Sequence, residues 1–222
     1  MELFTGYGLD YLFRWGHLLA GITWIGLLYY FNFVQTEYFK EAEADHKSGA
    51  IQKLVPRALW WFRWAAMFTF LTGVALLAVR HQAISFDITV GATLGTLMFL
   101  NVWLIIWPNQ KVVIASAVQV AGGGEAIPEA AASLAKAGLA SRTNTLFSLP
   151  MLFFMGSSAH LPHGLIGDAS TVAIGIIMLI ILILAGNGIF GKQGPMTSVG
   201  GVIGCGVGLT VVLYGLMAFL TV

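Results

Sequence analysis

The segment FRWGHLLAGITWIGLLYY, residues 13–30, decides how the rest of the chain is interpreted. It lies within a long apolar run at 9–34, and a membrane-spanning helix needs about 20 mostly apolar residues. Arg14 and His17 nevertheless stand one helical turn apart near its start. Ionisable residues inside a membrane-spanning helix are rare and usually face a site within the bundle. The segment therefore predicts a transmembrane helix that carries a polar site near one end.

The composition of the whole chain is that of an integral membrane protein. Its 222 residues are 58% hydrophobic and only 9% charged, whereas an ordinary soluble domain has about 25% charged residues. The net charge of +1 gives no indication of nucleic-acid binding. The opening residues MELFTGYGLD lack the basic region and cleavage site of a signal peptide. We therefore expect the first apolar run to remain in the mature protein.

Six apolar runs predict six transmembrane helices, at 9–34, 58–79, 84–107, 143–160, 170–188 and 198–221. Two longer polar connections, 35–57 and 108–142, separate the first helix from the second and the third from the fourth. No internal repeat and no linker divides the chain. The sequence therefore predicts one all-α membrane domain, a polytopic helical bundle over residues 1–222.

The positively charged residues indicate how the bundle is oriented. Most of them follow the first, third and fifth predicted helices: Lys40, Lys47, Lys53 and Arg57, then Lys111, Lys136 and Arg142, then Lys192. The opposite connections contain only Arg80. Because cytoplasmic loops are enriched in lysine and arginine, both termini are predicted to be periplasmic. The expected location is the bacterial inner membrane, with the lipid bilayer as the main partner and no nucleic acid.

Four of the five histidines then fall near the outer face: His17, His81, His160 and His163. Neutral imidazole is a good ligand for iron, copper and zinc, and helical bundles hold cofactors with side chains from facing helices. His17 and His160 are both predicted in helices, so they form the best ligand pair for haem b or, alternatively, for copper or iron. His81 and His163 are predicted in loops, where they either contribute to a metal site or simply lie at the membrane interface.

Helical spacing places Arg14, His17, Gly21 and Trp24 on one face of the first helix. Gly21 leaves room for a planar ring, on which Trp24 could pack. Arg14 could pair with a haem propionate, bind an anionic substrate or reach lipid headgroups. The predicted cofactor site is thus His17, His160, Arg14 and Trp24. Covalent haem c is excluded, because Cys205 is the only cysteine.

Two further patterns each have two interpretations. Asn109 and Gln110 follow Pro108, and together with Arg14 they could bind a purine-like substrate, or they could simply cap a helix end. Gly200, Gly204 and Gly208 have the four-residue spacing of small residues at close helix contacts. They predict tight packing of the last helix, either within the chain or against a partner.

Four stretches together resemble one known family: RWGHLLAGITWIG (14–26), WWFRWAAMFTFLTGVALL (60–77), NVWLIIWPNQKVV (101–113) and RTNTLFSLPMLFFMGSSAH (142–160). In this order they resemble the membrane domain of the bacterial cytochrome-c-linked urate oxidases, also called urate hydroxylases. The resemblance implies a membrane domain of about eight helices and a periplasmic cytochrome c domain that takes electrons from urate oxidation. This chain looks like a short form without that cytochrome c domain.

The resemblance carries two histidines over to this chain, His17 and His160. It implies two further histidines at positions where this chain has Trp60 and Thr143. It also implies an additional stretch between the second and third predicted helices, which would explain six helices here. The outer pair of histidines is thus retained, whereas other polar positions of the family differ.

Three functions follow from these patterns. The first is a redox membrane protein that binds haem b or a metal and passes electrons to a separate cytochrome c or a partner subunit, with urate as one substrate. The second is a non-catalytic accessory subunit of a larger respiratory or oxidase complex. The third is a transporter, which the sequence favours least, because the predicted helices 170–188 and 198–221 contain no acidic residue, lysine, arginine or histidine.

Overall fold

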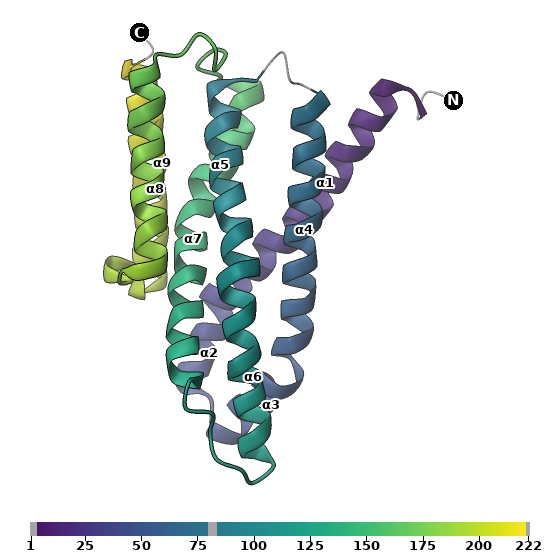
Figure 1. The fold of residues 1–222 in the computed structure, drawn as a ribbon, viewed down its shortest axis with the longest axis vertical. Coiled ribbons are helices and arrows are strands. Elements are labelled where there is room, and N and C mark those ends of the chain that lie inside the picture. Colours follow the sequence, from purple (N-terminus) through teal and green to yellow (C-terminus); the bar gives the residue numbers. More distant parts are fainter. Residues whose placement is uncertain (1–3, 80–83, 221–222) are drawn as a thin grey trace.

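The computed structural model of the chain describes residues 4–79 and 84–220. These residues form a bundle of long helices without a β-sheet (Figure 1), so the prediction of an all-α membrane protein is confirmed. In chain order the elements are α1 (Gly6–Tyr29), η2 (Tyr30–Gln35), α2 (Thr36–Glu41), α3 (Ala44–Lys53), α4 (Val55–Val79), α5 (Phe86–Leu100), η3 (Asn101–Ile106), α6 (Trp107–Ala121), α7 (Ala130–His160), α8 (Thr171–Phe190), η4 (Gly194–Thr197) and α9 (Val199–Leu220).

Five helical segments in the described part of the chain are long and apolar enough to cross a membrane. They are Gly6–Glu41, Val55–Val79, Phe86–Ala121, Thr171–Phe190 and Val199–Leu220. The first and third each have 36 residues, which corresponds to about 54 Å of helix. The hydrocarbon core of a bilayer is only about 30 Å thick, so their polar ends extend beyond it. The chain is accordingly a multi-pass membrane protein.

The remaining predicted crossing, 143–160, lies within α7 and does not stand out by its hydropathy. Figure 1 shows α7 between the α8–α9 pair and α5, and α7 packs against α1, α5, α6, α8 and α9. A helix surrounded by protein can carry polar residues that a lipid-facing helix cannot. The described chain begins and ends at the same end of the bundle (Figure 1), which agrees with an even number of crossings. We call this the outer end, and the end that carries α2 and α3 the inner end.

Two π-helical segments, η2 and η3, interrupt the long helices. In a π-helix each N–H bonds to the carbonyl five residues back, so a carbonyl at the junction loses its usual partner. An asparagine supplies a donor near each junction. Asn32 Nδ2 lies 2.9 Å from the carbonyl oxygen of Leu28, and Asn144 Nδ2 lies 2.9 Å from that of Met98. Because π-helical turns often occur at functional sites, η2 and η3 mark candidate positions for a site.

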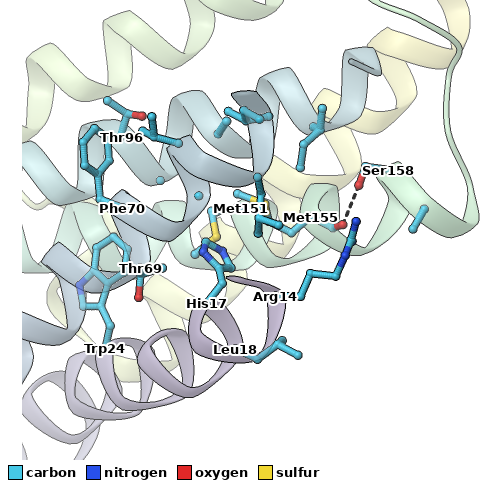
Figure 2. A pocket seen from close by; sticks show the side chains of 18 residues that line it. Arg14, His17, Leu18, Trp24, Thr69, Phe70, Thr96, Met151, Met155 and Ser158 are labelled. Atoms are coloured by element: carbon cyan, nitrogen blue, oxygen red, sulfur yellow. Dashed lines mark hydrogen bonds between the residues drawn. The ribbon is translucent and has the colours of Figure 1, made fainter. Parts of the chain in front are cut away.

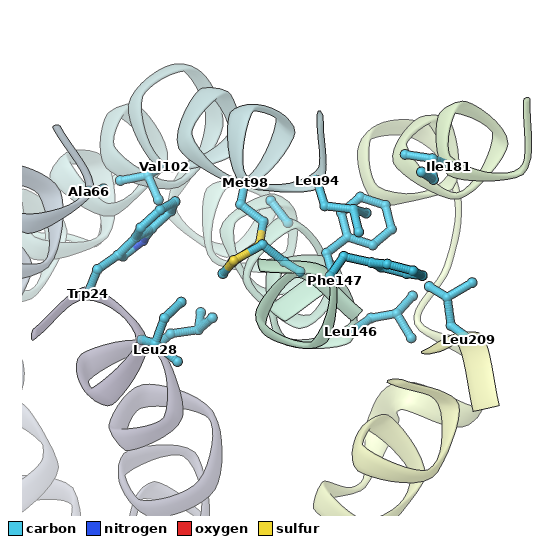
Figure 3. Packing of buried hydrophobic residues seen from close by; sticks show 14 of the residues in the cluster. Trp24, Leu28, Ala66, Leu94, Met98, Val102, Leu146, Phe147, Ile181 and Leu209 are labelled. Carbon is cyan, nitrogen blue, oxygen red and sulfur yellow. The ribbon is translucent and has the colours of Figure 1, made fainter. Parts of the chain in front are cut away.

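The interior is filled by apolar side chains from most of the long helices. Figure 3 shows Trp24 and Leu28 of α1 on one side of the bundle, and Ile181 of α8 and Leu209 of α9 on the other. Phe147 of α7 lies in the middle and is fully buried. This core fixes the position of α1 relative to α7, and thereby the walls of the cavities between them.

The glycines of α9 do not all pack in the same way. Gly206 faces α7, where an added Cβ would lie 3.1 Å from Leu149 Cδ1 and 3.2 Å from the carbonyl oxygen of Leu146. By contrast, Gly200, Gly204 and Gly208 are exposed, and an added Cβ at any of them would have no neighbour within 4 Å. The predicted packing of these three glycines within the chain is therefore wrong. Packing of this face against a partner stays a prediction.

Candidate functional site

A cavity of about 340 Å³ lies between α1, α4, α5 and α7 in the outer half of the bundle (Figure 2). We call it the outer cavity. Its walls are mostly apolar, and the residues that line it include Arg14, His17 and Trp24 of α1, Thr69 and Gly73 of α4, Thr96 of α5, and Met151, Met155 and Ser158 of α7. Three of the four predicted cofactor-binding residues therefore line one cavity, as their helical spacing indicated.

His17 is held in a defined orientation. Its Nδ1 atom lies 3.0 Å from Thr72 Oγ1, and the Thr72 hydroxyl donates its own proton to the carbonyl of Phe68 at 2.6 Å. A hydroxyl that donates to this carbonyl accepts from Nδ1. The arrangement therefore favours the neutral tautomer with the proton on Nδ1 and the lone pair on Nε2. This is how ligand histidines are commonly oriented at metal sites.

Gly73 makes space for the same imidazole ring. A Cβ atom at this position would lie 3.2 Å from His17 Cε1 and 3.6 Å from His17 Nδ1. Gly73 follows directly after Thr72 on α4, so one turn of this helix both anchors the ring and leaves room for it. Sequence reasoning did not identify either residue, because the contact partner of a helix face cannot be read from that helix alone.

The opposite wall of the cavity contributes sulfur. Met151 and Met155 lie one turn apart on α7, and Figure 2 shows His17 projecting from α1 toward Met151. Thioethers are soft ligands that suit copper(I) and haem iron. Trp24 is only 2% exposed, and its Nε1 has no hydrogen-bond partner among the described residues. The cavity thus brings together the imidazole of His17, two thioethers and a buried indole N–H that has no acceptor in the part of the chain that the structure describes.

Arg14 has a partner that the sequence interpretation overlooked. Its Nε lies 2.6 Å from Asp10 Oδ2, and its Nη2 lies 3.1 Å from Asp10 Oδ1. The ion pair spans one turn of α1 at the outer end, where both side chains are partly exposed. The four-residue spacing of Asp10 and Arg14 could have revealed it. Asp10 offsets much of the charge that Arg14 would otherwise offer to a propionate or an anionic substrate.

His160 does not share the outer cavity with His17. It is exposed at the last position of α7, and the preceding residue, Ala159, lines the cavity instead. The described residues contain no group of three or more histidine, cysteine, aspartate or glutamate side chains that could hold a metal. His81 lies outside the described residues. The pairing of His17 with His160 therefore stays a prediction.

His163 is engaged by a buried carboxylate. Asp87 on α5 is fully buried, and its Oδ2 accepts the backbone N–H of His163 at 2.7 Å. Its Oδ1 lies 3.1 Å from His163 Nδ1 and accepts the hydroxyl of Ser157 at 2.7 Å. The imidazole also packs against the Tyr214 ring of α9, with 4.6 Å between centroids. This cluster connects α5, α7 and α9 at the outer end and leaves only Nε2 of His163 for a metal.

The predicted substrate-binding residues are not brought together. Asn109 donates to the carbonyl of Ile105 at 2.8 Å, but it lies inside the continuous helical segment Phe86–Ala121, so the expected helix end at this position is wrong. Gln110 instead lines a second cavity, at the inner end of the bundle and therefore far from Arg14.

Trp60 and Thr143 stand at the positions where the family resemblance implied histidines. Trp60 is about half exposed on α4, and Thr143 donates to the carbonyl of Leu139. Neither of these two lines the outer cavity.

A comparison with known families bears on these residues. Residues 80–189 match the family described as urate oxidase N-terminal. The matched range contains the stretches 101–113 and 142–160, and hence Met151, Met155 and His160, whereas His17 precedes it. No curated protein and no solved structure matches the chain. The family match agrees with the motifs found in the sequence, and the chain belongs to the urate oxidase N-terminal-like family.

Proposed function

We propose that this protein is a redox protein of the bacterial inner membrane, related to urate oxidases, whose outer cavity binds haem b or a metal ion, either copper or iron, through His17. One observation carries the proposal: His17 lines an apolar cavity with its Nδ1 3.0 Å from Thr72 Oγ1, and in this arrangement Nε2 would be the ligand atom.

The other residues of the cavity fit such a group. Met151 and Met155 present thioethers on the wall contributed by α7, and imidazole with thioether is a ligand pair used for haem iron and for copper. We propose a thioether as the second ligand, because both methionines line the cavity and His160 does not. The unpaired Nε1–H of Trp24 would donate to an acceptor of the bound group.

A bound haem or copper ion supplies one-electron transfer. The protein's own residues would hold it away from water, since the walls of the cavity are mostly apolar. The cavity lies near the end of the bundle that is predicted to face the periplasm, where a separate cytochrome c or a partner subunit could accept electrons. Urate is the substrate suggested by the family, and its oxidation by this chain is part of the proposal.

The test is the cofactor content of the purified protein. We would express the chain in cells supplied with iron and copper, purify it in mild detergent, record its visible spectrum and determine its metals by elemental analysis. His17→Ala removes the proposed ligand. His46→Ala is the matched control, because His46 is an exposed histidine of α3. We expect a Soret band or about one metal ion per chain in the wild type and in His46→Ala, and its loss in His17→Ala.

A wild-type protein without haem, copper or iron would overturn the proposal. The accessory-subunit interpretation would then be favoured, and it predicts that the chain co-purifies with a larger respiratory or oxidase complex after gentle solubilisation. Equal cofactor content in His17→Ala and the wild type would show that the cofactor is not bound through His17 in the outer cavity.

A further inference from the structure

A second cavity, of about 430 Å³, lies at the inner end of the bundle, and we call it the inner cavity. Segments η2, α2, α3, α4, α6 and α7 all contribute to its walls. Its polar lining includes Asn32, Gln35, Lys40, Lys47, Gln110 and Arg142. No aspartate or glutamate is among the described residues that line it. Its polar side chains are thus amides, hydroxyls and cations, which is the composition of an anion site.

Arg142 is the central charge of this cavity. It is only 4% exposed, and its Nη1 has no hydrogen-bond partner among the described residues. Glu37 interacts with it electrostatically, but its carboxylate does not line the cavity and accepts two hydrogen bonds from Lys40, each of 2.8 Å. A buried cation with an unpaired donor is costly unless an anion compensates it. A ligand with an anionic oxygen would complete this site.

Within the part of the chain that the structure describes, Gln35 presents an unpaired acceptor, whereas Arg142 presents an unpaired donor. The Oε1 atom of Gln35 is buried and has no donor among the described residues. The π-helical segment η2 places Gln35 and Asn32 on the same cavity. The Asn32 amide nitrogen is already used, since it donates to the carbonyl of Leu28 and to Ser141 Oγ, at 2.9 and 2.8 Å. The unpaired atom of Gln35 is therefore the acceptor Oε1, and an N–H group of a ligand would satisfy it.

The shape of the cavity and the charges at its rim agree with a flat anion. The rings of Phe31, Phe39 and Phe62 line it, and Phe31 and Phe62 pack edge to face with 5.5 Å between centroids. Aromatic walls favour planar ligands. Lys40 and Lys47 are exposed at the rim, where positive charge raises the local concentration of anions.

We infer that the inner cavity binds a small heterocyclic anion, with an anionic oxygen at Arg142 and a ring N–H at Gln35. Acetate and other simple carboxylates supply only the first contact, whereas neutral N-heterocycles supply only the second. This site is separate from the outer cavity, so the inference does not rest on the cofactor proposed there. The anion would interact with the exposed lysines at the rim and with the buried Arg142. It would enter from the side of the membrane that is predicted to be cytoplasmic.

The experiment is a calorimetric titration of the full chain in detergent with three flat probes. Urate is an anion with ring N–H groups, benzoate is an anion without them, and uracil has N–H groups but no charge at neutral pH. We expect saturable binding of urate, at least about tenfold tighter than that of benzoate or uracil. Wild-type protein that melts cooperatively but does not bind urate, or that binds all three probes equally, would overturn the inference.

Variants then locate the site. Arg142→Gln and Gln35→Leu should each weaken urate binding by about tenfold or more, and Gln35→Leu should leave benzoate binding almost unchanged. Arg57→Gln is the matched control, because Arg57 is an exposed arginine near the same end. If Arg142→Gln does not fold, urate binding by Gln35→Leu is the test of the site. Gln35 is only partly buried, so this variant is expected to fold. Unchanged urate binding in folded Gln35→Leu, or an equal loss in His17→Ala, would contradict this location.

Discussion

His17 Nδ1 on α1 lies 3.0 Å from Thr72 Oγ1 on α4. This contact connects two helices that are far apart in the sequence and holds the imidazole in one orientation. The Thr72 hydroxyl also lies within hydrogen-bond distance of the carbonyl oxygen of Phe68, which favours the tautomer with the proton on Nδ1. A residue that the sequence marked only as an unusual histidine is thus oriented inside the outer cavity by the neighbouring helix.

The first prediction concerns Thr72. Thr72→Val removes the acceptor for Nδ1 while it keeps the size of the side chain, and Thr72→Ser keeps the hydroxyl. Loss of such an outer hydrogen bond weakens metal binding by about 10- to 100-fold. We therefore expect a lower cofactor content per purified chain in Thr72→Val than in Thr72→Ser, measured by absorbance and metal analysis. Equal contents in the two variants would show that Thr72 does not orient a ligand.

The second prediction concerns the space left by Gly73. Gly73→Ala would place Cβ 3.2 Å from His17 Cε1, so the ring must shift. We expect a changed absorption band or a reduced cofactor content. Gly21→Ala is the control, because a Cβ at Gly21 has no neighbour within 4 Å. A Gly73→Ala spectrum identical to that of Gly21→Ala would indicate that the ring position does not matter for the bound group.

The third prediction compares two glycines of α9. Gly206→Ala pushes a methyl group against Leu149 and the carbonyl of Leu146, whereas Gly204→Ala points into open space. Overpacking of a close contact costs about 1–3 kcal/mol. We expect Gly206→Ala to unfold at a lower temperature in detergent and Gly204→Ala to match the wild type. The reverse order would mean that Gly204, and not Gly206, is at the tight helix contact.

The fourth prediction concerns the buried carboxylate at the outer end. Asp87→Ala would leave the Ser157 hydroxyl and the backbone N–H of His163 without their acceptor. Each unsatisfied buried group costs about 1–3 kcal/mol, so the variant should be clearly less stable to heat. Asp168→Ala is the control, because Asp168 is exposed in the same loop as His163. Equal melting temperatures would argue against a structural role for Asp87.

Helical periodicity predicted part of the outer cavity because it is a local property of one helix. The spacing of Arg14, His17 and Trp24 put them on one face, and they do line one cavity. The partners from α4 and α7 could not be inferred, since no local pattern tells which helices pack against that face. Asp10 was missed although its spacing to Arg14 was visible.

Hydropathy predicted five spans well and treated the helix 143–160 as one more of the same kind. α7 differs because five other helices pack against it and cover many of its polar side chains. Its buried polar residues, including Arg142 and Asn144, were therefore assigned to a loop or overlooked. The inner cavity was not foreseen for the same reason: Arg142 was counted only as a cytoplasmic charge, and Gln110 was the one cavity residue that the sequence singled out.

The histidines show the limit of reasoning from membrane depth. Four of them were expected near the outer end, but being near one level does not make them neighbours. His163 is bonded to Asp87, and His160 is exposed beyond the outer cavity. Of the three described histidines at this end, His17 lines the outer cavity, whereas His160 and His163 do not.

The most direct test of the account is the cofactor content of His17→Ala and His160→Ala compared with that of the wild type, from the Soret absorbance and elemental analysis of each purified protein. The account predicts that His17→Ala loses the haem or metal, whereas His160→Ala retains it, because His160 does not line the outer cavity. A bound cofactor in His17→Ala at the wild-type level would contradict the assignment of His17 as its ligand.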